Sequence, residues 1–509
     1  MEPTFRKPLR LWPAGVLVAL LTLAEAWVWV MPQDTRQYRV MLSIAVGVIG
    51  ALLLLLWFLL FSRARWKTRI IVLAIVLLAV FGASRLLTIR GVTGDLRPII
   101  SWQGLGRPGT DEVSRSEEHQ TTRAAFGNYP QFLGPNRNAT VAGAGLGRDW
   151  KNSSPAEVWR RGVGEGWSGF AVSGDLAVTQ EQQGSEEQVV AYDLWSGEGR
   201  WRYGYQARFE TTIGGIGPRA TPTISGGRVF TLGATGVLTA LDFGTGEALW
   251  SHDIISEHGG SIPEWGMSGS PLVVDGRVVV SAGGKDERSL VAYDVVSGDW
   301  VWGGGKDGSS YSSPLEATLA GHRQIIILNR ASVAGHDPET GAVLWSHPWP
   351  GEQPNVAMPV VLPGNRLLIS SGYGIGSKVL AIEATEDGSL GATLVWESPR
   401  LKAKFTNVVL HQGNVFGLDD GVLVCLDPET GERCWKKGRY GHGQVLLADD
   451  LLLLSSEKGE VFLLEPTTEE VKKLGSFEAF RRKTWNVPAL VGRYLLMRND
   501  REAAMYELP

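Results

Sequence analysis

GHDPETGAVLW, residues 335–345, decides the fold because the same eleven positions return along the chain in altered form. In each copy an Asp is followed four residues later by a Gly, and that Gly is followed four residues later by a Trp. A unit that returns in this way is typical of a repeat architecture. The other copies are AYDLWSGEGRW (191–201), ALDFGTGEALW (240–250), AYDVVSGDWVW (292–302) and CLDPETGERCW (425–435).

Each copy predicts a β-hairpin. The apolar residues before the Asp form one strand, and a second short strand ends in the Trp. The segment from Asp to Gly has turn chemistry, because Asp and Thr side chains cap backbone amides and Gly adopts positive φ without a Cβ clash. A buried Trp removes about 150–250 Å² from water, which is about 4–6 kcal/mol gross at about 25 cal/mol per Å². We therefore expect the Trp to pack one repeat against the next.

The spacing of the repeats indicates a β-propeller. Units of about 40–50 residues with strand content are typical of propeller blades, each of which has four strands. An eighth unit, FLLEPTTEEVKKL, keeps the hairpin but has Leu474 where Trp is expected. The other units are marked by seven Trp residues, which are predicted to dock each blade onto the next: Trp159, Trp201, Trp250, Trp302, Trp345, Trp396 and Trp435.

The two ends of the repeat region are each incomplete, and the two deficits match. Before Trp159 there is only the strand-like AEVW, whereas after Leu474 the chain holds about three strands' worth of residues and no fourth strand. We therefore predict that a strand near 156–160 completes the C-terminal blade and closes an all-β, eight-bladed propeller over residues 155–509. Closure removes free sheet edges, which otherwise invite aggregation. The alternative is an open β-solenoid, which needs no complementary ends.

The first 88 residues differ in composition and are predicted to form a membrane anchor. Three apolar runs, at about 11–31, 40–61 and 70–87, are each long enough to cross a hydrocarbon core about 30 Å thick. The first run alone resembles a signal peptide, but two more runs follow it directly, and no small-residue cleavage site followed by a soluble chain is visible. We therefore expect three transmembrane helices ahead of the propeller.

Basic residues predict the orientation of this anchor. The loop SRARWKTR (62–69), between the second and third runs, has four basic residues and no acidic one, and Arg6, Lys7 and Arg10 add positive charge at the N-terminus. Because positively charged loops stay in the cytoplasm, we expect an inner-membrane protein with a cytoplasmic N-terminus and a periplasmic propeller. Residues 89–154 are expected to be a linker and a lead-in to the propeller.

Composition excludes several function classes. The formal net charge is −4 over 509 residues and no basic patch is visible, so nucleic acid is not an expected partner. The eight His residues are scattered without metal-ligand spacing, and no Walker-type phosphate loop occurs. Cys425 and Cys434 leave two interpretations open: an external compartment permits a disulfide, but a directly cross-strand bridge is strained and Cys is also a good small core residue.

The pattern A-x-D-x-x-x-G-x-x-x-W resembles the tryptophan-docking repeat of the pyrroloquinoline quinone (PQQ) propeller superfamily. The match is best at 240–250 and 292–302. This superfamily includes redox enzymes and non-enzymatic scaffolds such as the BamB-like factor of outer-membrane protein assembly, so the resemblance implies the fold and leaves the function open. Four further segments are similar to those of membrane-anchored PQQ-binding-like β-propeller repeat proteins: YPQFLGPNRNAT (129–140), GPRATPT (217–223), SYSSP (310–314) and GRYGHGQ (438–444).

The loops that lead into the innermost strands form the predicted binding site. In a propeller such loops converge on one mouth of the central channel. Aromatic rings stack on planar groups and Arg holds carboxylates in a bidentate fork, so a planar or acidic ligand is expected. The alternative is that these residues only bind channel water and let strands crowd near the axis. The candidate ligand-binding residues are Trp167, Arg219, Tyr311, Asn355, Asn407, Tyr440, His442, Trp485 and Asn486.

The sequence predicts a binding or scaffold module with an envelope protein or peptide as partner. We assign no catalytic residue, no metal and no cofactor, and expect a monomeric, membrane-anchored propeller. The alternative is a PQQ-dependent dehydrogenase that oxidises an alcohol or sugar. The resemblance implies that such an enzyme needs a bound quinone, Ca²⁺ held by acidic and amide side chains, and a carboxylate base. Acidic residues near the predicted mouth are few, and the nearest are Glu210, Glu264 and Asp307.

Overall fold

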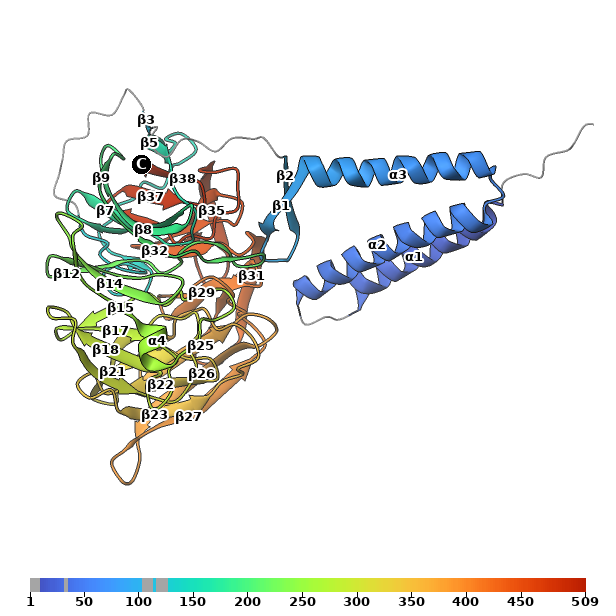
Figure 1. The fold of residues 1–509 in the computed structure, drawn as a ribbon. Coiled ribbons are helices and arrows are strands. Elements are labelled where there is room, and N and C mark those ends of the chain that lie inside the picture. The colour runs from blue at the N-terminus through green and yellow to red at the C-terminus, as the bar shows by residue number, and fades with distance from the viewer. Residues whose placement is uncertain (1–9, 32–34, 103–112, 116–126) are drawn as a thin grey trace, which may run out of the picture. The chain divides into compact units, whose positions relative to one another are not determined.

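Three long apolar helices dominate the N-terminal part of the chain in a computed structural model, which describes residues 10–31, 35–102, 113–115 and 127–509 (Figure 1). Helix α1 spans Trp12–Val30, α2 spans Arg36–Phe61 and α3 spans Trp66–Leu86, and each is long and apolar enough to cross a membrane. The strands β1 (Leu87–Val92) and β2 (Pro98–Trp102) then pair as a hairpin inside the stretch that the sequence predicts as linker. These elements belong to one compact unit, residues 1–106, and the rest of the chain forms a second unit.

The second unit is built from antiparallel sheets whose strands follow one another in chain order, as propeller blades do. Among the described residues six sheets have four strands and two have five, which gives eight such sheets. The first four sheets are β6–β9 (Ala171–Ser173, Leu176–Gln183, Glu186–Asp193, Gly199–Gln206), β12–β15 (Thr223–Ser225, Arg228–Leu232, Val237–Asp242, Ala248–Asp253), β16–β19 (Leu272–Val274, Arg277–Ser281, Leu290–Asp294, Trp300–Gly304) and β20–β23 (Leu315–Leu319, His322–Leu328, Ser332–His336, Val343–Pro348).

The remaining sheets continue the same order. Central strands are buried on both faces, whereas the outermost strands alternate between half-buried and exposed positions, as in β9. A short helix, α4 (Ile254–His258), and a small hairpin, β10 (Glu210–Thr211) with β11 (Gly215–Ile216), lie between sheets. The later sheets are β24–β27 (Val360–Leu362, Arg366–Ser371, Gly376–Ala384, Leu390–Ser398), β28–β31 (Val409–His411, Asn414–Asp419, Val422–Leu426, Arg433–Arg439), β32–β35 (Gln444–Ala448, Leu451–Ser455, Glu460–Pro466, Val471–Glu478) and the strands β36–β38 (Ala489–Val491, Tyr494–Arg498, Glu502–Glu507).

The first strand of the repeat region completes the last sheet. Strand β5 (Ala156–Gly162) pairs antiparallel with β38, with Trp159 opposite Met505 (Figure 1). Strand β3 (Val113–Arg115), which lies in the polar stretch predicted as linker, pairs with the outer edge of β5. The two ends of the repeat region are therefore hydrogen-bonded to each other, a pairing that an open solenoid does not need.

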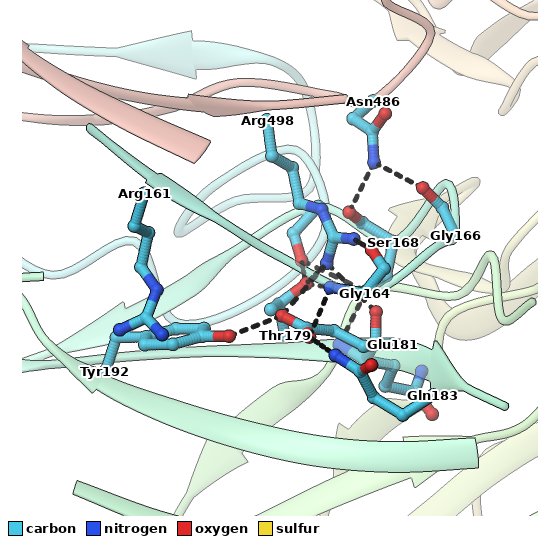
Figure 2. Close-up of polar contacts among 12 residues, drawn as sticks. Arg161, Gly164, Gly166, Ser168, Thr179, Glu181, Gln183, Tyr192, Asn486 and Arg498 are labelled. Atoms are coloured by element: carbon cyan, nitrogen blue, oxygen red, sulfur yellow. Dashed lines mark hydrogen bonds and ion pairs between the residues drawn. The ribbon is translucent and has the colours of Figure 1, made fainter. Parts of the chain in front are cut away.

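A buried polar network lies where these two ends meet (Figure 2). Arg498 on β37 is 1 % exposed, and its guanidinium donates to Thr179 Oγ1 (2.7 Å) and to Gly164 O (2.9 Å). Glu181 on β7 lies 4.0 Å from the same guanidinium and accepts hydrogen bonds from the hydroxyl of Tyr192 (2.6 Å) and from Gly164 N (2.7 Å). The network thus joins the last sheet to the first sheet through one buried cation and one buried carboxylate.

The repeated Trp residues dock each sheet onto the next sheet along the chain. The Nε1 of Trp302 donates to the carbonyl of Pro338 (3.2 Å) in the following Asp-to-Gly turn. Gly341 of that turn has a φ of +75°, and a Cβ on it would lie 2.4 Å from the Trp302 ring, so the turn needs glycine for its backbone and for the space. The same donation to a carbonyl of the next unit is made by Trp159, Trp201, Trp250, Trp396 and Trp435.

Two units depart from this pattern. Trp345 donates to Gln324 Oε1 in its own sheet, because the next unit has a longer turn without the corresponding Gly. Leu474, which takes the place of a docking Trp, lies in the same core cluster as Trp150. A Cβ on the neighbouring Gly475 would lie 2.4 Å from the Trp150 Cβ, so an indole from the lead-in packs at this position.

Residues 129–141 of the lead-in run along the innermost strands, and we call this segment the channel plug. Tyr129 forms an isolated bridge with Val172 on β6, and Thr140–Val141 (β4) pairs parallel with β32 as an additional inner strand. Leu133 is buried in a cluster with apolar residues of three further sheets, namely Leu315, Met358 and Val409. The plug therefore occupies the channel axis, whereas the sequence predicts this segment only as a lead-in.

Arg137 holds the plug in place. It is 3 % exposed, and its two terminal nitrogens donate to the carbonyls of Pro271 (2.9 Å) and Ser270 (3.0 Å), just before β16. Burial lowers the pKa of Arg137 to about 9. A cation that is desolvated to this extent needs its carbonyl partners, which ties the plug to the sheet around it.

Both cysteines are free thiols in the structure. Cys425 is buried on β30, and Cys434 is exposed on β31. A β-bulge places Trp435 opposite Cys425 and Arg433 opposite Leu426. Cys434 therefore has no directly opposite partner in the ladder, unlike the register that the repeats suggest.

Candidate binding site at the channel mouth

Loops that enter the innermost strands surround a cavity of about 130 Å³. All eight sheets contribute to its wall, because twelve of the fourteen lining residues lie at or shortly before the start of an innermost strand, and Gly214 lies in the β10–β11 hairpin. Phe132 of the channel plug also lines the cavity, so the plug closes the channel beneath this mouth. The lining residues are Phe132, Trp167, Gly214, Arg219, Thr221, Trp265, Ser268, Tyr311, Val356, Phe405, Asn407, Gln444, Trp485 and Val487.

Five aromatic rings of the wall form a continuous chain, which we call the aromatic collar: Trp167, Trp485, Phe405, Trp265 and Tyr311. Their successive ring centroids lie 5.0, 4.8, 6.0 and 5.2 Å apart. These separations are in the range where tilted and offset aromatic pairs attract one another. The collar therefore presents a preformed apolar surface to a ligand.

Hydrogen bonds fix two of the collar rings. The Nε1 of Trp167 donates to Gly214 O (2.8 Å), and the Nε1 of Trp485 donates to Glu457 Oε1 (2.9 Å). Both indole N–H groups are thus committed to the protein, and the two rings offer a ligand their faces and edges.

Arg219 holds the loop that covers one side of the mouth. Its Nη2 donates to the carbonyls of Gly214 (2.9 Å) and Gly215 (3.0 Å), its Nη1 donates to Gly217 O, and its guanidinium lies 4.6 Å from the Phe209 ring centroid. Burial lowers the pKa of Arg219 to about 10. Because both terminal nitrogens already bond the loop, the bidentate carboxylate fork that the sequence suggests is not available without breaking these bonds.

A second cation lies at the mouth. The Nζ of Lys483 is 3.9 Å from the Trp485 ring centroid and 4.5 Å from the Trp167 ring centroid, the geometry of a cation–π contact. Burial lowers the pKa of Lys483 to about 8, while Asp500 and Glu457 act in the opposite direction. Lys483 was not among the residues that the sequence singles out.

Asn407 and Gln444 bring two amides to the cavity wall. The Oδ1 of Asn407 accepts from Met358 N (2.9 Å). The Nε2 of Gln444 donates to Phe405 O (2.7 Å) and to Trp485 O (2.8 Å). One end of each amide is therefore bound to the backbone of a neighbouring sheet, and this bonding fixes which end is oxygen and which is nitrogen.

Five of the nine predicted site residues line the cavity: Trp167, Arg219, Tyr311, Asn407 and Trp485. Asn355 is instead a scaffold amide, which donates to the carbonyls of Asn329 (3.0 Å) and Arg330 (2.9 Å). Asn486 has the same role, because its Nδ2 donates to Gly166 O (3.2 Å) and Ser168 O (2.8 Å) beside the Arg498 network (Figure 2).

The other two predicted residues also lie outside the lining. Tyr440 packs edge-on against Phe462, with ring centroids 4.9 Å apart. His442 is 1 % exposed and packs against the Phe405 ring, with centroids 5.5 Å apart, so it supports the collar from behind.

Trp265, Phe405, Gln444 and Phe132 line the cavity but are not among the predicted site residues. Phe405 lies two residues before Asn407 and Gln444 lies two residues after His442, so attention to aromatic and amide side chains beside the predicted residues would have found both. Trp265 lies in a loop from which no site residue was predicted. Phe132 gave no such signal, because it lies far away in the sequence and reaches the cavity through the plug.

The lining residues do not fit a Ca²⁺-held quinone. No Asp or Glu is among the fourteen described residues that line the cavity, and one of its two amide oxygens, Asn407 Oδ1, already accepts a backbone hydrogen bond. Hard cations such as Ca²⁺ need six to eight oxygen ligands. At about 130 Å³ the cavity is also below the roughly 300–1,000 Å³ of sites for drug-sized ligands.

The three acidic residues nearest the predicted mouth do not change this result. Glu210 forms an exposed ion pair with Arg208 (2.7 Å). Asp307 accepts hydrogen bonds from Ala331 N (2.9 Å) and Ser332 Oγ (2.7 Å), so it holds a loop. Glu264 is exposed just before Trp265 and does not line the cavity.

Residues 150–262 and 261–437 match the family described as outer membrane protein assembly factor BamB. Together the two matches cover more than half of the chain. The chain belongs to this family. A search of curated protein sequences gave no match. The predicted PQQ-like propeller superfamily and the predicted β-propeller behind three apolar helices are thereby confirmed.

Solved structures share the fold. BamB from Moraxella catarrhalis superposes with a TM-score of 0.50 at 16 % identity, over 70 % of this chain and 98 % of that protein. Quinohemoprotein alcohol dehydrogenase from Comamonas testosteroni gives a TM-score of 0.54 at 12 % identity, over 74 % of this chain and 80 % of that enzyme. The computationally designed Ika8 protein gives a TM-score of 0.50 at 12 % identity, over 68 % of this chain and 98 % of that protein. At these identities the likeness concerns the fold alone.

Proposed function

We propose that this protein is a membrane-anchored binding module, which uses the mouth of its propeller to hold an envelope protein or peptide and catalyses no reaction. The observation that carries the proposal is the cavity itself. It is walled by five aromatic rings and closed beneath by Phe132, and none of the described residues that line it carries a carboxylate that would serve as a general base. Membership of a family described by outer membrane protein assembly supports a role in envelope protein assembly.

The anchor sets the place where this binding happens. We infer that α1, α2 and α3 cross the inner membrane with the N-terminus in the cytoplasm, because Arg63 and Arg65 lie in the α2–α3 connection and Lys67 and Arg69 lie at the start of α3. Three crossings then place the propeller in the periplasm.

Exposed Cys434 tests this location directly. A small membrane-impermeant maleimide should label intact cells at Cys434 without prior reduction, whereas Cys434→Ser should remove the label, because Cys425 is buried. Labelling that appears only after the inner membrane is broken contradicts a periplasmic propeller.

Photo-crosslinking from the rim of the mouth tests the binding role. Ile213 and Ile262 are exposed hydrophobic residues near the Arg219 loop and the Trp265 loop, with 38 % and 41 % exposure. A photoreactive residue at either position should capture a discrete partner in cell membranes, and Trp485→Ala should reduce that capture. Glu339 is exposed in an Asp-to-Gly turn, where the strand directions place it at the opposite end of the sheets, and serves as the control position. Equal capture from all three positions would exclude the mouth as the binding face.

The dehydrogenase alternative receives no support from the lining residues. Fold likeness to an alcohol dehydrogenase at 12 % identity does not extend to the site. Purified full-length protein supplied with PQQ and Ca²⁺ should not reduce a dye with alcohols or sugars, and sustained dye reduction would overturn the binding-module proposal.

A further inference from the structure

The two amides of the cavity wall each have one uncommitted end. The Nδ2 of Asn407 and the Oε1 of Gln444 form no hydrogen bond with any residue that the structure describes, although both residues line the cavity and are only 5 % and 3 % exposed. The committed ends are bonded to backbone, so neither amide can turn round without losing those bonds. The two amides therefore present one fixed N–H donor group and one fixed carbonyl acceptor. In the same wall the buried Nε1 of Trp265 also has no hydrogen-bond partner among the described residues.

The donor on Asn407 and the acceptor on Gln444 belong to neighbouring sheets, and a hydrogen bond between these sheets brings the two residues close together. Gln444 begins β32 and bonds the carbonyl of Phe405, two residues before Asn407 in the preceding sheet. The rings of Phe405 and Trp485, whose carbonyls both accept from Gln444, are 4.8 Å apart. The amide pair is thus set beside the apolar face of the collar.

A donor beside an acceptor is complementary to a carboxamide, which carries both a carbonyl and an N–H. A carboxylate accepts from the Asn407 donor but would bring a second oxygen towards the Gln444 oxygen. A hydrocarbon would bury both polar ends without partners, which is unfavourable. Of these three groups, only the carboxamide satisfies both amides.

We infer that the mouth binds a carboxamide carried on one apolar or aromatic group of about ring size. This inference rests on the proposed function, since it names the chemistry that the same cavity recognises. The volume of about 130 Å³ matches a single small group seated inside the mouth. A primary aromatic amide and a backbone amide of a polypeptide next to an aromatic side chain share this chemistry.

Binding by the full-length protein in lipid nanodiscs tests the inference. Tryptophan fluorescence and calorimetry would compare benzamide, benzoate, toluene and N-acetyl-phenylalanine N-methylamide, of which the last represents the polypeptide source. Benzamide or the blocked amino acid should bind at least about tenfold more tightly than benzoate and toluene. Whichever of the two binds more tightly identifies the source of the amide.

Asn407→Asp changes only the end that faces the ligand. An Asp at this position still accepts from Met358 N but offers an acceptor where Asn offers a donor. Benzamide affinity should fall by about tenfold or more, and benzamidine, which carries only donors, should bind more tightly than it does to the unaltered protein. Asn414→Asp makes the same change in the same sheet at the β28–β29 turn, where the side chain bonds Gln412 O, and should leave both affinities unchanged.

The outcomes separate this inference from the proposed function. Benzoate binding as tightly as benzamide, or benzamide binding unaffected by Asn407→Asp, overturns the amide assignment while the mouth remains a ligand site. Absence of binding by all four probes, with crosslinks from Ile213 and Ile262 retained, also overturns the amide assignment alone. Loss of the rim crosslinks overturns the proposed function itself.

Discussion

Single residues at the mouth do two tasks at once, because they shape the cavity and hold the backbone around it. Arg219 places a desolvated cation in the wall, and its terminal nitrogens donate to three carbonyls of the adjoining loop. One end of the Asn407 amide and one end of the Gln444 amide likewise bond the backbone, while both residues line the cavity. A substitution at such a residue therefore changes both stability and binding, and the choice of variant decides which effect is measured.

Arg219→Met should lower the free energy of unfolding by about 1–3 kcal/mol, because the carbonyls of Gly214, Gly215 and Gly217 lose their donor in a partly buried loop. Denaturant unfolding followed by tryptophan fluorescence measures the loss. Arg208→Met removes an Arg from the same region whose contacts, an ion pair with Glu210 and a hydrogen bond to Gly184 O, are both exposed, and should have little effect. Equal losses in the two variants would show that the carbonyl bonds of Arg219 contribute nothing specific.

Lys483 predicts a pH dependence of stability. Its pKa is lowered in the folded protein, from 10.5 to about 8, so the unfolded chain binds the proton more readily. The free energy of unfolding should therefore rise as the pH increases from about 8 to 10.5, and the destabilisation that comes from burying the charged Lys483 should be fully present below pH 8. Over that range the free energy of unfolding of the unaltered protein should increase relative to that of Lys483→Met. A difference independent of pH would mean that the Lys483 ammonium is not desolvated.

The sequence predicted which loops surround the cavity, but not which of their amides line it and which only hold the backbone. The loops before the innermost strands were identifiable because repeat spacing fixes where each strand starts. Whether an amide in such a loop faces the cavity depends on partners in a neighbouring sheet, as Asn355 shows with the carbonyls of Asn329 and Arg330. These partners are not visible in local sequence. The same reason explains why Phe132 was missed.

At the scale of the element, the repeat works as an interlocking pair of features, an indole on one sheet and a glycine in the next turn. The eleven-residue pattern predicted the hairpin, the positive φ of the glycine and the packing of the Trp, because all three are local consequences of turn chemistry and burial. It did not predict that Trp150 would pack beside Leu474, since that contact depends on where the lead-in runs.

A double-mutant cycle tests the interlock. Trp302→Ala should cost about 3–5 kcal/mol of unfolding free energy, as large-to-small core substitutions do. Gly341→Ala should also be destabilising, because its Cβ would lie 2.4 Å from the Trp302 ring. In the Trp302→Ala background the same change should cost only the roughly 1–2 kcal/mol of a positive-φ alanine.

Gly321→Ala is the matched control for this cycle. Gly321 has a φ of +77°, close to the +75° of Gly341, but nothing lies within 4 Å of an added Cβ. It should show the backbone cost alone, whether or not Trp302 is present. Additive effects of Trp302→Ala and Gly341→Ala would contradict the interlock.

At the scale of the whole propeller, the join between β5 and β38 is the place where the two ends of the repeat region depend on each other. Beside this join, Arg498 on β37 donates hydrogen bonds to Thr179 and Gln180 on β7 and so links the last sheet to the first (Figure 2). Removing one partner of a buried charge pair leaves the other uncompensated, so closure should be sensitive to this pair.

Arg498→Leu should lower the free energy of unfolding by about 3–5 kcal/mol, because Glu181 would keep its charge in a buried site. Calorimetry and denaturant unfolding measure this loss. Arg481→Leu removes an exposed partner of Glu478 in the preceding loop and should have little measurable effect. If Arg498→Leu were as mild, the join would be held by strand pairing alone.

The channel plug has a consequence for the order in which the protein is made. Residues 129–141 leave the ribosome before β5 and all later strands of the sheets that surround them, and in the finished protein they are enclosed by those sheets. The sheets of the propeller are therefore assembled around the channel plug, which is already present when they form. A version of the protein in which this segment is supplied last, at the C-terminus, would have to thread it into a ring that has already closed.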